Sequence, residues 1–254
     1  MPSNTAPVVP EPLFTRPSIP SSLLLLVCLS LLMGCGEEPV YRDGAPEEEG
    51  GSGRVYMGRE IADVMSSEHG ALWLDRPERD EEELPQRLLR ALELNASDVV
   101  ADIGSGTGFF TFRLADLVPS GRVYAVDVQQ ALVDTIQVRA DRGGRRNVTA
   151  VLGTEMSPEL PASRLDLALI VSSYHEFSYP REMLESLYGS LKPGGRLVIV
   201  EYRAEDETTE IEDVHRMGQD QIIREGEAAG FQYRETIDVL PQQHIVVFTV
   251  PIED

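Results

Sequence analysis

A short apolar run that breaks into three regularly spaced glycines constrains the fold of this chain more than any other feature. Residues 99–108 read VVADIGSGTG. The apolar run is typical of a buried parallel strand, and a helical pattern follows the glycines at 109–115. A strand, a glycine loop and a helix in this order bring bare backbone close to a ligand in α/β proteins. The pattern therefore predicts a ligand-binding α/β domain.

The spacing of the glycines argues against two common nucleotide-binding loops. Gly104, Gly106 and Gly108 form G-x-G-x-G, and Phe109 stands where the dinucleotide-binding loop requires a small residue for helix–strand packing. No G-K-[ST] follows, which excludes a P-loop. Asp102, inside the end of the strand, suits a ligand with an amino group better than one with a pyrophosphate.

A second acid follows at the distance expected within one βαβ unit. Asp127 ends a predicted strand at 123–126, and a spacing of about 20 residues from the glycine loop allows its carboxylate to accept hydrogen bonds from both ribose hydroxyls. An L-K-P-G-G turn at 191–195 precedes another predicted strand. With Asp102 and the three glycines, these features resemble the class I S-adenosylmethionine-dependent methyltransferases over residues 54–254.

The resemblance implies an α/β fold with a Rossmann-like, doubly wound, seven-stranded sheet that ends in an antiparallel hairpin. Further strands are expected at 147–152, 165–171, 196–200, 231–237 and 244–250, and helices near 108–117, 129–141, 180–191 and 208–229. Pro180 fits the first turn of a helix and Gly230 the position just after one.

The resemblance also implies a binding site for S-adenosyl-L-methionine. Asp127 would bind the ribose, Val128 would pack on the adenine, and Thr154 would lie near the adenine amino group. Ser172 ends the fourth strand and should face the same crevice, because ligands of open parallel sheets bind beyond the carboxyl ends of the strands. The glycine loop completes the expected cofactor site with Asp102, Gly104, Ser105, Gly106 and Gly108.

Methyl transfer from a sulfonium needs orientation more than acid–base chemistry, and it requires no metal. His175 is the candidate base or acceptor-orienting group, since a neutral imidazole can accept a proton near pH 7. Tyr174 and Glu176 are the alternatives. Glu201 is interpreted as a solvated acid, His215 as a surface residue and Trp73 as buried packing.

The charge balance restricts the acceptor. The chain has 43 acidic and 22 basic residues and a formal net charge of −21, which argues against a nucleic-acid partner. The leading hypothesis is therefore methyl transfer to a small molecule. The alternatives are an NAD-dependent oxidoreductase and a non-catalytic, nucleotide-binding lipoprotein. The non-catalytic alternative is considered because S-adenosylmethionine is made in the cytosol, and an exported domain would have no access to it.

The first 35 residues resemble a bacterial lipoprotein signal peptide. The apolar run at 23–33 is too short to span a bilayer, which takes about 20 residues, but it suits a signal-peptide core. Leu32-Met33-Gly34-Cys35 resembles a lipobox, with Cys35 as the lipid-anchored residue. A used signal predicts a membrane-anchored lipoprotein of the cell envelope. The alternatives are a start at Met57 and a cytoplasmic location.

These patterns divide the chain into four parts. Residues 1–35 are the signal segment and 36–53, rich in acids, glycine and proline, are a predicted disordered linker. Residues 54–97 are a predicted helical lid segment, with helices at 61–65 and 80–94. Residues 98–254 are the predicted methyltransferase domain.

Overall fold

The computed structural model describes residues 40–66, 70 and 73–252. The signal peptide and the Cys35 anchor predicted from the sequence lie outside these residues. No helix within the described ranges combines the length and the apolar character needed to cross a bilayer.

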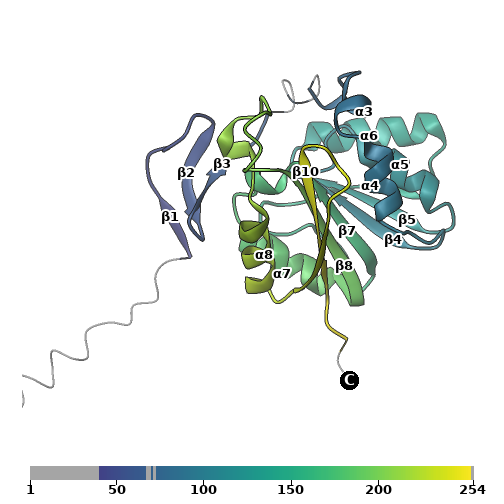
Figure 1. Cartoon of the computed structure of the whole chain (residues 1–254). Coiled ribbons are helices and arrows are strands. Elements are labelled where there is room, and N and C mark those ends of the chain that lie inside the picture. The colour runs from purple at the N-terminus through teal and green to yellow at the C-terminus, as the bar shows by residue number, and fades with distance from the viewer. Residues whose placement is uncertain (1–39, 67–69, 71–72, 253–254) are drawn as a thin grey trace, which may run out of the picture. The chain divides into compact units, whose positions relative to one another are not determined.

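A seven-stranded sheet forms the centre of the domain, in the order β6-β5-β4-β7-β8-β10-β9 (Figure 1). All neighbours pair in parallel except β10, which is antiparallel to both β8 and β9. This architecture confirms the predicted Rossmann-like sheet with an antiparallel C-terminal hairpin. The strands are β4 (Val99–Ile103), β5 (Arg122–Asp127), β6 (Val148–Leu152), β7 (Leu165–Val171), β8 (Leu191–Tyr202), β9 (Gln232–Ile237) and β10 (Gln243–Thr249).

Helices cover both faces of this sheet, and the alternation of side chains along each strand explains how. In β4, Val100 packs in the apolar cluster of α4 (Pro85–Ala91) and α5 (Phe109–Leu117). Its neighbour Ala101 packs in the cluster of α7 (Pro180–Ser190) and α8 (Gln219–Ala228), because successive side chains point to opposite faces. α6 (Gln130–Gly143) packs along β5 and β6. A sheet buried on both faces leaves its strand ends as the accessible part.

A small antiparallel sheet replaces most of the predicted linker. Its strands are β1 (Tyr41–Asp43), β2 (Gly51–Tyr56) and β3 (Arg59–Ala62). The predictions of a disordered 36–53 segment, from Tyr41 onward, and of a helix at 61–65 are therefore wrong. Composition misled here, because few apolar residues suffice for a hairpin whose buried side chains rest on a neighbouring domain. Tyr56 and Ile61 are 2% and 1% exposed.

Contacts between this small sheet and the main domain are specific. The Tyr41 ring meets the Tyr179 ring edge-to-face, with centroids 5.7 Å apart, and its hydroxyl donates a hydrogen bond to Glu182 of α7. A chain starting at Met57 would lack β1 and β2 and these contacts.

Two predicted helices are shorter than expected. The helix predicted at 80–94 is broken into α3 (Arg79–Glu82) and α4, because Leu84 is left-handed (φ 48°) and Pro85 begins the second piece. In the region predicted to be helical at 208–229, only a 3-10 turn, η2 (Asp213–His215), and α8 form. Pro180 begins α7 and Gly230 follows α8 with φ 93°, as predicted.

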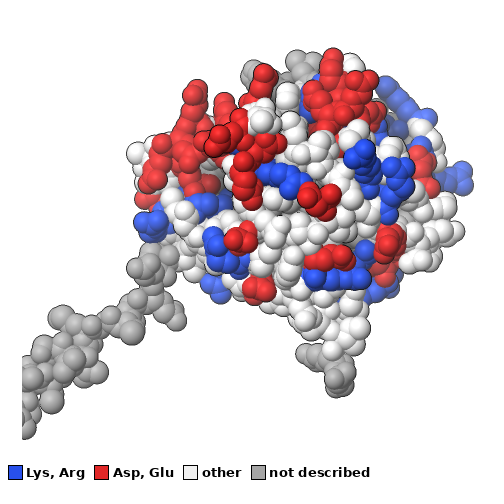
Figure 2. Space-filling model, in the orientation of Figure 1, with Lys and Arg blue, Asp and Glu red and all other residues white. Residues whose placement is uncertain are grey.

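Acidic side chains dominate part of the surface. Figure 2 shows them gathered over the end of the molecule that carries β2 and α3, whereas arginines are scattered among other residues. α3 itself contributes Asp80, Glu81 and Glu82 in its first turn.

Candidate functional site

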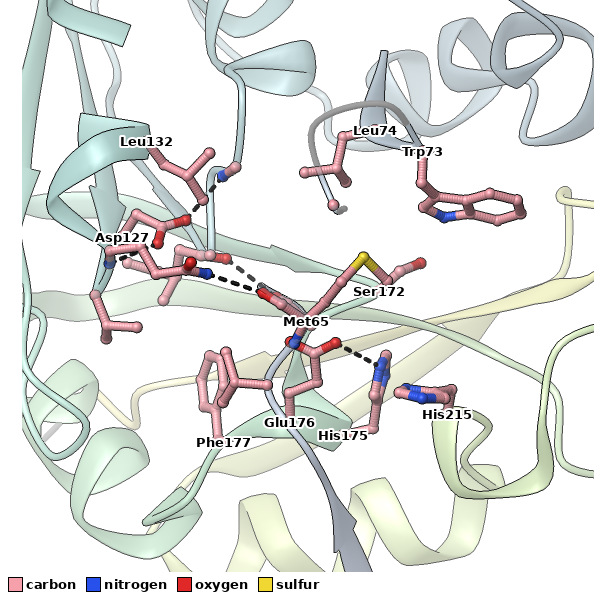
Figure 3. Close-up of a pocket in the computed structure, with 18 of the residues that line it drawn as sticks. Met65, Trp73, Leu74, Asp127, Leu132, Ser172, His175, Glu176, Phe177 and His215 are labelled. Carbon is pink, nitrogen blue, oxygen red and sulfur yellow. Dashed lines mark hydrogen bonds and ion pairs between the residues drawn. The ribbon is translucent and has the colours of Figure 1, made fainter. Parts of the chain in front are cut away.

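A cavity of about 390 Å³ opens at the carboxyl ends of β4, β5, β7 and β8. One wall is made by the glycine loop and the end of β5. The opposite wall is made by η1 (Tyr174–Glu176) and η2. Residues 64–66, 70, 73 and 74 complete it, and Figure 3 shows Trp73 and Leu74 across the cavity from Phe177. The site therefore lies where ligands of doubly wound sheets bind.

The glycine loop is held open by its own backbone. Gly104, Gly106 and Gly108 all have positive φ, of 69°, 55° and 90°. Residues with a side chain rarely adopt this backbone conformation. A Cβ on Gly104 would lie 2.5 Å from Ser173 Oγ, and one on Gly106 would lie 2.7 Å from Leu74 Cδ1. Glycine at these positions keeps the loop backbone exposed to the cavity.

Asp127 joins the loop to the end of β5. Its Oδ2 accepts a hydrogen bond from Gly106 N at 3.0 Å, and its Oδ1 accepts one from Gln129 N at 2.9 Å. Burial raises the pKa of Asp127, and these backbone hydrogen bonds oppose that rise. The side chain lines the cavity beside Val128, which is 40% exposed. Carboxylate and apolar surface thus stand together where the sequence predicts the ribose and the adenine.

The structure brings six of the nine predicted cofactor residues to the cavity wall, namely Gly104, Gly106, Asp127, Val128, Thr154 and Ser172. The other three, Asp102, Ser105 and Gly108, do not line the cavity and instead shape the loop. Ser105 Oγ donates to Val126 O at 3.1 Å, and Gly108 caps α5.

Asp102 is buried rather than aimed into the crevice, contrary to the prediction. It is 3% exposed, and its Oδ2 accepts a hydrogen bond from Thr111 Oγ1 at 2.6 Å. Burial raises the pKa of Asp102 to about 6, although the Thr111 hydrogen bond lowers it. The carboxyl therefore ties the end of β4 to α5.

Across the cavity, His175 is paired with a buried acid. Its Nδ1 lies 2.8 Å from Glu201 Oε2, and Glu201 Oε1 accepts a hydrogen bond from Tyr174 N at 2.7 Å. Glu201 is 0% exposed, so its interpretation as a solvated acid is wrong. The end of β8 turns this side chain inward beneath η1. Glu201 and His175 are 26 residues apart, so no local sequence pattern shows this contact.

The charge of His175 differs from the expectation of a neutral imidazole. Burial lowers the pKa of His175, but the Glu201 and Glu176 carboxylates outweigh that effect and raise it to about 9. With only protein groups around it, the ring is therefore protonated at pH 7. The carboxylates of Glu176 and Glu201 thus favour a positive charge on the His175 ring.

Tyr174 does not share the cavity with His175. It is fully buried, its hydroxyl donates to Glu225 Oε2 at 2.7 Å, and burial raises its pKa well above the usual value. Its predicted role as an alternative catalytic group is not supported, because the hydroxyl points into the packed region between η1 and α8.

Two further cavity residues, His215 and Trp73, were misread from the sequence, and a third, Glu176, is one of the predicted alternatives to His175. His215 was interpreted as a surface residue, yet its ring meets His175 edge-to-face with centroids 5.0 Å apart. Glu176 Oε1 lies 3.7 Å from His175 Nε2. Trp73 is 42% exposed and contacts Arg76, whose guanidinium carbon lies 3.8 Å from the ring centroid, so it is not buried packing. His175 and His215 are 40 residues apart in the sequence, so no local pattern predicts that their rings meet.

Comparison with known proteins agrees with the geometry. The family model described as a methyltransferase domain matches residues 100–195. A probable cobalt-precorrin-6B C(15)-methyltransferase (decarboxylating) of Methanothermobacter thermautotrophicus is 31% identical over 134 residues, 52% of this chain and 67% of that protein. A protein-L-isoaspartate O-methyltransferase of Ignicoccus hospitalis is 29% identical over 113 residues, 44% of this chain and 51% of that protein.

A solved structure extends the similarity. A SAM-dependent methyltransferase from Aquifex aeolicus superposes with a TM-score of 0.69 at 26% identity, covering 74% of this chain and 100% of that one. The chain spans about two thirds of the first curated relative and about half of the second, so neither transfers its acceptor to this protein. Fold, site and relatives together show that the chain belongs to the class I S-adenosylmethionine-dependent methyltransferases.

Proposed function

We propose that this enzyme transfers the methyl group of S-adenosylmethionine to a small molecule bound beside His175. The observation that carries the proposal is the arrangement of two unlike walls around one cavity. The glycine loop and Asp127 face His175, Glu176 and His215 across it (Figure 3). A volume of about 390 Å³ falls within the range of roughly 300–1,000 Å³ that is usual for small-molecule sites.

The residues of the first wall fit the cofactor. Gly104 and Gly106 leave room for close approach, Asp127 offers a carboxylate for hydroxyl groups, and Val128 offers apolar surface for a base. Ser172 and Thr154 add hydroxyls to the same wall. When bound, S-adenosylmethionine supplies a methyl group already activated on a sulfonium, so the protein contributes mainly proximity and orientation.

The charge of the cavity complements a cationic ligand. Arg79 is the one arginine or lysine among the described lining residues, whereas six lining residues are acids: Glu83, Asp127, Glu155, Glu176, Glu210 and Glu212. Acidic walls attract a sulfonium and repel polyanions. This supports a neutral or cationic small molecule as acceptor, in place of a nucleic acid.

The second wall is assigned to the acceptor. Glu201 fixes the His175 ring through Nδ1, which leaves Nε2 to face the cavity. We propose that His175 orients the acceptor atom toward the methyl group. Tyr202 and the lid residue Trp73 help to exclude water from the same space.

Methyl labelling tests the acceptor class. The full-length protein is incubated with methyl-labelled S-adenosylmethionine and an extract of its native cells, which is then separated into low-mass, protein and nucleic-acid fractions. We expect label in the low-mass fraction, and less of it with the His175→Gln variant. Label confined to protein, as the name of the isoaspartate relative suggests for that enzyme, would overturn the proposal.

We also propose that Cys35 is acylated and that the chain is anchored at the cell envelope. The support is the apolar run at 23–33 followed by Gly34-Cys35. Metabolic labelling with a fatty acid should label the wild-type chain but not a Cys35→Ala variant. An unlabelled wild-type chain in the cytosolic fraction would contradict the anchor.

A further inference from the structure

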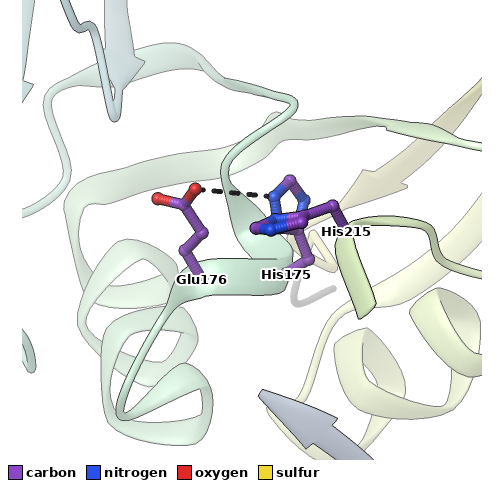
Figure 4. Close-up of side chains that lie close together, drawn as sticks. All are labelled: His175, Glu176 and His215. Atoms are coloured by element: carbon purple, nitrogen blue, oxygen red, sulfur yellow. Dashed lines mark ion pairs between the residues drawn. The ribbon is translucent and has the colours of Figure 1, made fainter. Parts of the chain in front are cut away.

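The second wall of the cavity holds a group of side chains with the composition of a metal site. His175, Glu176 and His215 each present one ligand atom, and these atoms lie within 4.8 Å of one another (Figure 4). His175 Nε2 and Glu176 Oε1 are 3.7 Å apart. Bonds of about 2.0–2.2 Å in a tetrahedral site separate ligand atoms by about 3.4 Å, so small side-chain rotations complete the geometry.

A buried acid behind the cluster strengthens this interpretation. Glu201 Oε2 lies 2.8 Å from His175 Nδ1 and is fully buried. A carboxylate on the far nitrogen of a histidine is the usual support of a metal-binding ring, because it fixes the tautomer that leaves Nε2 free to bind.

The surrounding charges favour a cation. Glu212 Oε2 lies 3.7 Å from His215 Nε2, and Glu210 lines the same cavity. The guanidinium of Arg59 donates to the His175 carbonyl oxygen and to Glu225. The carboxylates of Glu176, Glu210 and Glu212 therefore give this wall of the cavity the charge that a metal ion requires.

We propose that His175, Glu176 and His215 bind one divalent transition-metal ion, with Glu201 as the positioning residue behind His175. Imidazole and carboxylate ligands together suit zinc, iron(II) and similar ions. Three protein ligands leave positions open, as in catalytic sites. This assignment rests on the proposed function in one respect: the open positions face the acceptor, which would then carry an oxygen or nitrogen atom able to bind the metal.

Metal titration tests the proposal without turnover. The full-length chain, produced without a polyhistidine tag, is titrated with Zn²⁺ by calorimetry and with Co²⁺ by visible absorption. We expect one saturable site per chain and a Co²⁺ spectrum of four- or five-coordinate metal. Glu201→Gln should weaken Zn²⁺ binding by about 10–100-fold, the usual effect of losing such a support, and His215→Gln or Glu176→Gln should weaken it at least as much.

Two controls separate the possible failures. His244→Gln removes a buried histidine of β10 that lies 3.3 Å from Glu205, and it should leave Zn²⁺ affinity unchanged. Adenosylhomocysteine binding is measured on every variant to show that the fold and the cofactor site persist. A wild-type chain that binds adenosylhomocysteine but shows no saturable metal site, or a site unaffected by His215→Gln and Glu176→Gln, overturns the metal proposal alone. A wild-type chain that does not bind adenosylhomocysteine overturns the proposed function instead.

Discussion

At the scale of single residues, two aspartates at neighbouring strand ends have different tasks. Asp127 lines the cavity, whereas Asp102 is enclosed and bonded to Thr111. The sequence predicts both at strand ends, because each acid lies at the end of a short apolar run. It cannot tell which carboxyl the loop covers, since that depends on the path of the backbone between them.

The burial of Asp102 predicts a pH-dependent cost to stability. Its pKa is raised from 3.8 to about 6 in the folded protein, so the folded state binds more protons than the unfolded state between these values. Stability should therefore fall as pH rises through this window, by about 3 kcal/mol at 1.36 kcal/mol per pKa unit.

The Asp102→Asn variant should escape this cost. We expect its free energy of unfolding to exceed that of the wild type at pH 7 by about 1–3 kcal/mol, and the gain to vanish below pH 4. Denaturant unfolding at several pH values measures it, with Asp134→Asn, at an exposed position of α6, as the control. A gain that is equal at pH 4 and pH 7 would contradict the assigned cause.

At the scale of elements, the glycine loop provides a matched comparison. Gly104 and Gly144 have similar φ, 69° and 63°, but a Cβ on Gly144 would meet nothing within 4 Å. Gly144→Ala should cost only the left-handed backbone strain, roughly 1–2 kcal/mol. Gly104→Ala should cost more, because Ser173 must also move, and it alone should weaken adenosylhomocysteine binding. Equal effects of the two variants on calorimetric affinity would count against the loop's role.

A buried ion pair fixes the small sheet beside the site. Arg59 of β3 lies 2.7 Å from Glu225 of α8, with side chains 12% and 0% exposed, and Arg59 also donates to the His175 carbonyl oxygen. Arg59→Met leaves a buried carboxylate without its partner and should destabilise the protein by about 3–5 kcal/mol.

The double variant Arg59→Met/Glu225→Gln should regain most of this loss in denaturant unfolding, since it removes both charges. If the double variant is less stable than the single one, packing rather than the ion pair holds the sheet.

The elements that could be predicted from the sequence are those with strong local patterns. All seven strands of the main sheet and the start of α7 follow from apolar runs, Pro180 and turn residues. The small sheet, the break at Leu84 and the Glu201–His175 pair depend on contacts between distant segments. Tyr56 and Glu225, for example, are buried where β2 and β3 pack on the domain, and no short stretch of the sequence reveals that packing.

At the scale of the whole molecule, charge repulsion opposes folding. A net charge of −21 is destabilising in a compact state, and salt screens it over a Debye length of about 10 Å at 0.1 M. The thermal midpoint should therefore rise by a few degrees as sodium chloride increases from low concentration to about 0.5 M. A midpoint that falls would show that surface ion pairs such as Arg139–Asp75 outweigh the repulsion.

The central claim concerns the whole site: the glycine loop and Asp127 bind the cofactor. Calorimetric titration of adenosylhomocysteine into the wild-type protein and the Asp127→Asn variant tests it most directly, with Asp134→Asn as control and NADH as competing ligand. Losing a charged hydrogen-bond acceptor costs about 1.5–3 kcal/mol, so we expect affinity to fall at least tenfold in Asp127→Asn only, and no binding of NADH. Unchanged affinity in Asp127→Asn, or tighter binding of NADH than of adenosylhomocysteine, would contradict the account.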